Sequence, residues 1–155
     1  MTLDGARVLV VGASSGIGRS FAIEAARAGA AVALSARRAE RLSEVVEAMG
    51  GGHALVTDVR SADDCDRMVQ AALDALGGLD LVLYAAGFAP LRRVGDVEVD
   101  DLAAVFETNV FGVQHVLRAA VPHVAPAGLV AVLSSETAAR PWHGLGPYAS
   151  SKAAV

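Results

Sequence analysis

Short apolar runs alternate along the chain with segments in which apolar residues recur at helical spacing. Five runs predict strands, at residues 7–11, 31–35, 53–57, 79–85 and 129–133. The i, i+3, i+4, i+7 pattern between them predicts helices that end near Gly29, Gly50 and Gly77, and a longer helix from about Asp100 to Pro122. A last helix is expected from near Pro147, because the fixed φ of proline suits a first helical turn.

This alternation predicts an α/β fold, because strand-helix-strand units build a parallel sheet with helices on its faces. No linker, repeat or low-complexity segment interrupts the pattern, so we expect one domain over residues 1–155. The last helix is followed for only about two turns before Val155, and we therefore expect the domain to be truncated at its C-terminus.

Composition excludes several classes of protein. With 54% hydrophobic and 19% charged residues, the chain is expected to fold around a core rather than stay disordered. A net charge of −4 and the lack of a basic run argue against nucleic acid or a membrane surface as partner. No stretch predicts a membrane span or a secretory signal, and the single Cys65 fits a cytoplasmic location. The four histidines lack metal-ligand spacing, so no metal is expected.

The segment Gly12-Ala-Ser-Ser-Gly16-Ile-Gly18 joins the first predicted strand to the first predicted helix. Free N–H groups at such a helix start can hold a pyrophosphate, and the glycines allow a close approach. The spacing is not that of a P-loop, which disfavours an ATPase. Two alternatives remain: a glycine-rich turn without a ligand, and a serine hydrolase with Ser14 as nucleophile in a G-x-S-x-G elbow. Only eleven residues precede the loop, which leaves no earlier strand to supply an oxyanion loop to a hydrolase.

The second predicted strand is followed by Ser35-Ala36-Arg37-Arg38. An Asp or Glu at this point would bind a free ribose 2′-hydroxyl, and none is present. Guanidinium groups suit a 2′-phosphate instead, which favours NADP over NAD. We assign the phosphate to Arg37, and expect Arg38 only to open a solvated helix.

Tyr148 and Lys152 are spaced i and i+4 on the last predicted helix, so their side chains share one face. An ammonium beside a phenol stabilises the phenolate, which makes tyrosine a usable proton donor and acceptor. Such a pair also occurs by chance on amphipathic helices, so a purely structural role is the alternative when the pair is considered alone.

Together these features resemble the short-chain dehydrogenase/reductase family over the whole chain. The motifs that carry the resemblance are, in chain order, Gly12, Gly16 and Gly18, then Asp58, Ala86-Gly87, Asn109, Ser135, and Tyr148 with Lys152. The resemblance implies a Rossmann-like, doubly wound parallel sheet of strand order 3-2-1-4-5, with the family's later strands absent from this sequence. It also implies homodimers or homotetramers that pack through the fourth and fifth helices.

The resemblance further implies an NADP-dependent oxidoreductase that interconverts a carbonyl and an alcohol in a small-molecule substrate. Tyr148 would be the general acid and base, and Ser135 would bind the reacting oxygen. Lys152 would hold the nicotinamide ribose, and Asn109 would organise a water. The residues expected to bind the cofactor are Gly12, Ser14, Ser15, Gly16, Ile17, Gly18, Arg37, Asp58, Val59, Ala86, Gly87, Tyr148 and Lys152. A catalytically silent nucleotide-binding module is the alternative.

Two positions depart from the family's pattern. Val11 stands where a threonine is usual before the first glycine, and Tyr84-Ala85 replaces the usual Asn-Asn before Ala86-Gly87. These changes remove side-chain hydrogen bonds that tie the sheet to its loops, so we expect altered local bracing with cofactor binding retained.

Overall fold

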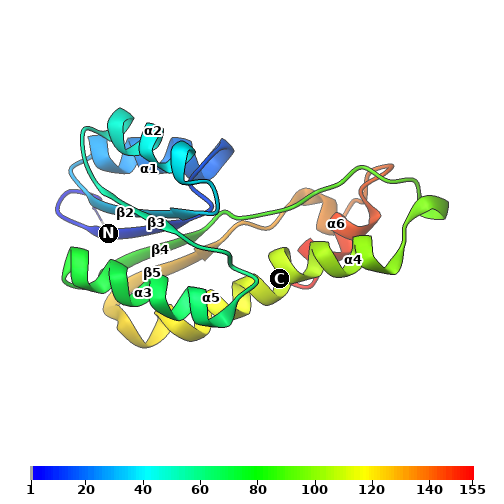
Figure 1. Ribbon diagram of the computed structural model, residues 1–155. Helices are drawn as coiled ribbons and strands as arrows, with labels where there is room; N and C mark the ends of the chain where they lie inside the picture. The colour runs from blue at the N-terminus through cyan, green and yellow to red at the C-terminus, as the bar shows by residue number, and fades with distance from the viewer. Residues whose placement is uncertain (1) are drawn as a thin grey trace.

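The structure, a computed structural model, describes residues 2–155 and places a parallel sheet between two layers of helices (Figure 1). The five strands lie in the order β3-β2-β1-β4-β5. Their bounds are β1 Arg7–Val11, β2 Ala31–Ala36, β3 His53–Val56, β4 Leu79–Tyr84 and β5 Val124–Val132. Both the α/β class and the strand order expected from the sequence are confirmed.

The central strand β1 supplies side chains to two separate cores. Val8 and Val10 pack under α1 (Gly16–Arg27) and α2 (Ala39–Met49), which cover one face of the sheet. Leu9 and Val11 face α3 (Ala62–Leu76) and α5 (Gly112–Ala120) on the other. All four side chains are completely buried, because a parallel sheet covered on both faces leaves no solvent-exposed side for its central strand.

The helix predicted from Asp100 to Pro122 is not one regular helix. It divides into α4 (Val99–Phe106), a π-helical turn (Glu107–Phe111), α5, and a 3₁₀ turn (Val121–His123). The π turn inserts one extra residue per turn, so it rotates α5 relative to α4 and releases backbone groups from their usual partners. Periodicity gives no sign of this turn, and it contains Asn109.

Strand β5 also differs from the prediction, since it begins at Val124 and is only partly buried. Leu129 to Val132 pair regularly with β4, and this part matches the predicted strand. The earlier residues pair only at Val124, and an irregularity containing Pro126 and Gly128 lies between. We expected a strand buried on both faces, but within residues 2–155 β5 is the edge of the sheet, and its Leu129 is half exposed.

The last helix, α6 (Gly146–Ala153), begins one residue before Pro147 and lies beside α4, beyond the carboxyl ends of the strands (Figure 1). Two 3₁₀ turns, Val94–Asp96 and Glu136–Ala138, lie in the segments that lead to α4 and α6. Among the helices of residues 2–155, none has both the length and the apolar character needed to cross a membrane.

Candidate active site

A pocket opens at the carboxyl edge of the sheet, at the end of β1. Strand β1 pairs with β2 on one side and with β4 on the other. Ligands of doubly wound sheets bind at this point, because the diverging loops leave a crevice between them. Most of the predicted site residues line it: Gly12, Ser14, Ser15, Gly16, Ile17, Arg37, Asp58, Val59, Ala86, Gly87, Tyr148 and Lys152. Gly18, Asn109 and Ser135 are not in its lining.

The glycine loop is held very close to the segment after β4. Gly12 has a φ of +92°, and a Cβ at this position would lie 2.6 Å from the Cα of Ala86. The N–H groups of Gly12 and Ala13 both donate to the Ser35 carbonyl, at 2.7 and 3.0 Å. Gly18 faces inward, where a Cβ would lie 3.2 Å from the Cβ of Ala85. Gly18 therefore permits close packing rather than contacting a ligand.

The start of α1 offers backbone donors to an anion. Its N-cap residue, Ser15, makes no side-chain hydrogen bond to the helix, and the first turn contains no acidic residue. The N–H groups of Gly16 to Gly18 are therefore not capped by a side chain within the described residues. With the helix dipole directed at the same point, this end of the pocket fits the pyrophosphate of a dinucleotide.

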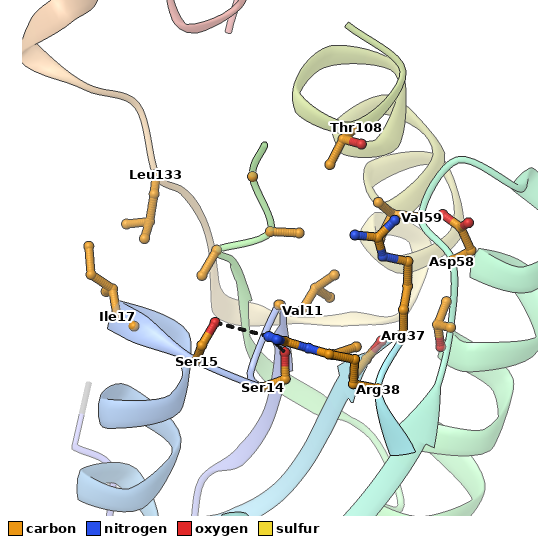
Figure 2. A pocket seen from close by; sticks show the side chains of 18 of the residues that line it. Val11, Ser14, Ser15, Ile17, Arg37, Arg38, Asp58, Val59, Thr108 and Leu133 are labelled. Atoms are coloured by element: carbon orange, nitrogen blue, oxygen red, sulfur yellow. Dashed lines mark hydrogen bonds between the residues drawn. The ribbon is translucent and has the colours of Figure 1, made fainter. Parts of the chain in front are cut away.

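The two arginines after β2 point in different directions (Figure 2). Arg38 is the N-cap residue of α2, as a residue opening a helix would be, but its guanidinium also donates to the hydroxyls of Ser14 at 2.9 Å and Ser15 at 3.3 Å. Arg37 points toward Val59 and Asp58. The pocket is therefore lined by two guanidinium groups, which extend in different directions from the end of β2.

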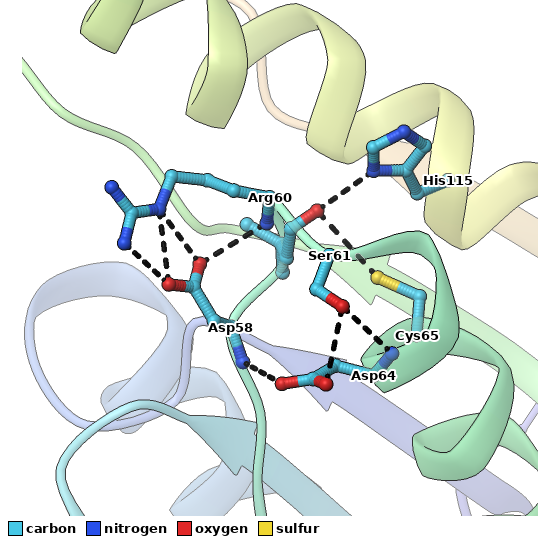
Figure 3. A network of polar contacts seen from close by, with 7 residues as sticks. Asp58, Arg60, Ser61, Asp64, Cys65 and His115 are labelled. Atoms are coloured by element: carbon cyan, nitrogen blue, oxygen red, sulfur yellow. Dashed lines mark hydrogen bonds and ion pairs between the residues drawn. The ribbon is translucent and has the colours of Figure 1, made fainter.

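Asp58 lines the pocket on the side toward which Arg37 points, and it is bound to Arg60 (Figure 3). The Arg60 side chain donates to both carboxylate oxygens, the shortest contact being 2.6 Å, and the Arg60 amide donates at 3.1 Å. These hydrogen bonds lower the pKa of Asp58, so the carboxylate stays charged. The Asp58 amide donates to Asp64, whose own amide donates to the Ser61 hydroxyl at the start of α3.

Tyr148 and Lys152 lie on one face of α6, as their spacing predicts. The Lys152 Nζ is 5.8 Å from the centre of the Tyr148 ring and donates to the Leu133 carbonyl at 2.7 Å. Lys152 is only 4% exposed, and burial lowers its pKa because desolvation disfavours the ammonium. One N–H of the ammonium is used by Leu133, which leaves two further donors for other partners.

Ser135 follows β5 and has a partly buried hydroxyl. Its Oγ accepts hydrogen bonds from the amide and the hydroxyl of Thr137, at 3.2 and 2.8 Å. Because both contacts use the oxygen as acceptor, the Ser135 hydrogen remains available to donate. Its neighbour Ser134 does line the pocket, and donates to the Lys152 carbonyl at 3.0 Å.

Asn109 is fully buried in the π turn and joins two other segments. Its Oδ1 accepts from the Phe88 amide at 2.8 Å, and its Nδ2 donates to the Phe88 carbonyl at 3.0 Å and to the Ser151 hydroxyl at 2.9 Å. Ser151 in turn donates to the Tyr148 carbonyl at 2.7 Å. Asn109 therefore fixes the loop after β4 against α6 from behind the pocket.

A family model described as short chain dehydrogenase matches residues 6–155. The chain belongs to the short-chain dehydrogenase family. A hydroxysteroid 11-beta-dehydrogenase 1-like protein of Xenopus tropicalis is 40% identical over 161 residues, covering 99% of this chain and 56% of that protein. The 11-beta-hydroxysteroid dehydrogenase-like 2 of Arabidopsis thaliana is 34% identical over 160 residues, covering 99% and 52%. The chain thus spans about half the length of these relatives.

Solved structures of the family have the same fold. A short chain dehydrogenase from Burkholderia cenocepacia in complex with NADP is 33% identical, with a TM-score of 0.93, covering 99% of this chain and 65% of that one. A family member from Burkholderia phymatum in complex with NAD is 28% identical, also with a TM-score of 0.93, covering 99% and 57%. Family members thus bind either dinucleotide, and membership alone leaves the choice between them open.

Sequence reasoning missed several polar residues that line the pocket of this family member, among them Arg38 and Ser134. Arg38 was expected only to open a helix, and nothing local shows that its guanidinium reaches the glycine loop. Ser134 directly precedes the predicted Ser135, so the Ser-Ser pair was visible, but which hydroxyl faces the pocket depends on how the strand ends.

The alternative of a serine hydrolase finds little support in this geometry. Ser14 accepts a hydrogen bond from Arg38, and the described residues that line the pocket include no histidine to serve as its base. Within residues 2–155, no cluster of three or more histidine, cysteine or acidic side chains is placed to hold a metal ion.

Proposed function

We propose that this chain forms the cofactor-binding and catalytic part of an enzyme that interconverts a carbonyl and an alcohol with NADP(H). The observation that carries the proposal is the convergence of Tyr148 and Lys152 on the same pocket as the glycine loop. A dinucleotide whose pyrophosphate lies at the start of α1 would supply or accept the hydride at the other end of this pocket.

Tyr148 then acts as the general acid and base, giving its phenolic proton to the carbonyl oxygen during reduction and taking it back during oxidation. The Lys152 ammonium, held beside the ring, stabilises the phenolate that remains. Its two free donors can also bind ribose hydroxyls. Ser135 donates its available hydrogen to the reacting oxygen and so favours the negative charge that develops there.

The preference for NADP rests on the arginine pair. No acidic residue follows β2 at residues 35–38 to bind a free 2′-hydroxyl, whereas Arg37 and Arg38 both line the pocket at this point. Arg37 is the primary phosphate ligand in this proposal, and Arg38, now bound to Ser14 and Ser15, adds a second guanidinium.

The test is Tyr148→Phe in the full protein, assayed with NADPH against a panel of small ketones and aldehydes. The variant should bind NADPH with unchanged affinity, measured by the fluorescence of the reduced nicotinamide, and should lose turnover by about 10²- to 10⁴-fold. Binding by the same variant is the internal control for correct folding.

Two results would contradict the proposal. Turnover that survives in Tyr148→Phe would remove the tyrosine from the mechanism. NADPH binding without turnover on any substrate, in wild type and variant alike, would favour the catalytically silent nucleotide-binding module. Assembly as a homodimer or homotetramer and a cytoplasmic location stay predictions.

A further inference from the structure

Tyr84, at the end of β4, has a buried hydroxyl with a single specific partner in the described chain. The residue is 1% exposed, and its hydroxyl donates to the carbonyl of Thr108 at 2.6 Å. Burial raises the pKa of Tyr84 far above its usual value, so the hydroxyl remains a donor. This tyrosine stands where the family usually has asparagine, and it connects the central sheet to the π turn.

The π turn makes this contact possible. The amide of Gly112 donates five residues back to Glu107, so it no longer serves the carbonyl of Thr108, its partner in a regular α-helix. The Tyr84 hydroxyl binds that carbonyl instead. Gly112 leaves room for it, because a Cβ there would lie 2.6 Å from the Tyr84 oxygen and 2.9 Å from Val59. The tyrosine, the glycine and the π turn therefore fit one another.

The next residue in the turn is Asn109, which holds both the loop after β4 and α6. Its side chain binds Phe88 through two hydrogen bonds and Ser151 through one. Ser151 binds the carbonyl of Tyr148. A continuous path thus runs from the Tyr84 hydroxyl to the carbonyl of Tyr148. It passes through the peptide unit that precedes Asn109, the Asn109 side chain and the Ser151 hydroxyl.

We propose that Tyr84 is a positioning residue for catalysis: its hydroxyl fixes the π turn so that Asn109 holds Tyr148 in its reactive place. The inference rests on the proposed function, because it gives Tyr84 a part in that reaction. Packing alone does not account for the hydroxyl, since a phenylalanine would fill the same apolar space without a buried polar group that requires a partner.

Tyr84→Phe tests the inference in the full protein, because it removes the hydroxyl and keeps the ring. We expect kcat to fall about fivefold to tenfold, the size of one lost hydrogen bond, while KM for NADPH changes less than about twofold. Amide exchange of Phe88 and of α6 should become faster, while exchange in β2 and β3 stays unchanged.

Val82→Ala is the matched control. Val82 lies in the same strand and the same core, is fully buried, and belongs neither to the π turn nor to the residues that line the pocket. This variant should lose stability and keep kcat. An equal fall of kcat in both variants would mean that Tyr84 contributes only to stability, and the proposal would be wrong.

Coupling through Asn109 is tested by combining Tyr84→Phe with Ser151→Ala. If both act on the placement of Tyr148 along one route, the combined loss of kcat should be clearly smaller than the product of the single losses. Independent, multiplying losses would overturn the proposal. A wild-type protein without turnover would refute the proposed function, while unchanged exchange of the Phe88 amide in Tyr84→Phe would by itself refute the coupling.

Discussion

Gly12 and Gly16 lie in the same loop and both have positive φ, but only Gly12 lacks space for a side chain. A Cβ on Gly12 would lie 2.6 Å from the Cα of Ala86 and 2.7 Å from the carbonyl carbon of Ala85, which are backbone atoms that cannot rotate away. A Cβ on Gly16 has no neighbour within 4 Å. Alanine at each position therefore separates the cost of the backbone conformation from the cost of overlap.

The expected magnitudes follow from these contacts. Holding alanine at positive φ costs about 1 kcal/mol at either position. Overlap with backbone adds about 1 to 3 kcal/mol for Gly12→Ala alone. Urea denaturation should thus show the free energy of unfolding lowered by about 2 to 4 kcal/mol in Gly12→Ala and by about 1 kcal/mol in Gly16→Ala.

The substitution of Gly16 should affect nucleotide binding more than it affects stability. Gly16 lines the pocket beside the uncapped N–H groups at the start of α1, where we place the pyrophosphate, so an added methyl group is expected to hinder the approach of the phosphates. Gly16→Ala should therefore raise the Kd for NADPH by about tenfold or more despite its small effect on folding. Equal losses of stability in the two variants would refute the close contact with Ala86. Unchanged NADPH affinity in Gly16→Ala would refute the assigned pyrophosphate position.

Two further predictions concern charged groups. Arg37→Asp should weaken NADPH binding far more than NADH binding in fluorescence titrations. Equal effects on both would show that Arg37 does not bind the 2′-phosphate. Hydrogen bonds from Arg7 lower the pKa of Asp80 from 3.8 to about 2, so its charge stabilises the fold above about pH 4, and this contribution is lost as the pH falls toward 2. Asp80→Asn should lower the free energy of unfolding by about 1 to 2 kcal/mol at neutral pH, after a discount for solvent screening, and by little near pH 2. Glu24→Gln, which changes an exposed ion pair, should lower it by almost nothing at either pH. A loss of stability in Asp80→Asn that does not change with pH would contradict this reasoning.

Strands and helices were predictable where burial imposes a simple period. β1 lies where it was predicted because its residues form an almost fully buried apolar run. α3 ends where it was predicted because its buried residues recur at helical spacing up to Gly77. β5 did not, because its start depends on Val124 pairing with Leu79 on another strand. The reach of Arg38 to Ser14 likewise spans 24 residues of sequence, and no local pattern encodes such a contact.

The π turn shows most clearly why part of the site could not be predicted from periodicity. Its residues would continue an ordinary helix if only the local pattern counted, since no proline or glycine lies within Glu107–Phe111. What distinguishes it is Tyr84, which is 24 residues away and binds the carbonyl that the turn releases. The family resemblance implied that Asn109 is a site residue, but its contacts with Phe88 and Ser151 depend on that turn. The placement of Tyr148 therefore rests on buried polar contacts between distant segments as well as on the helix that carries it.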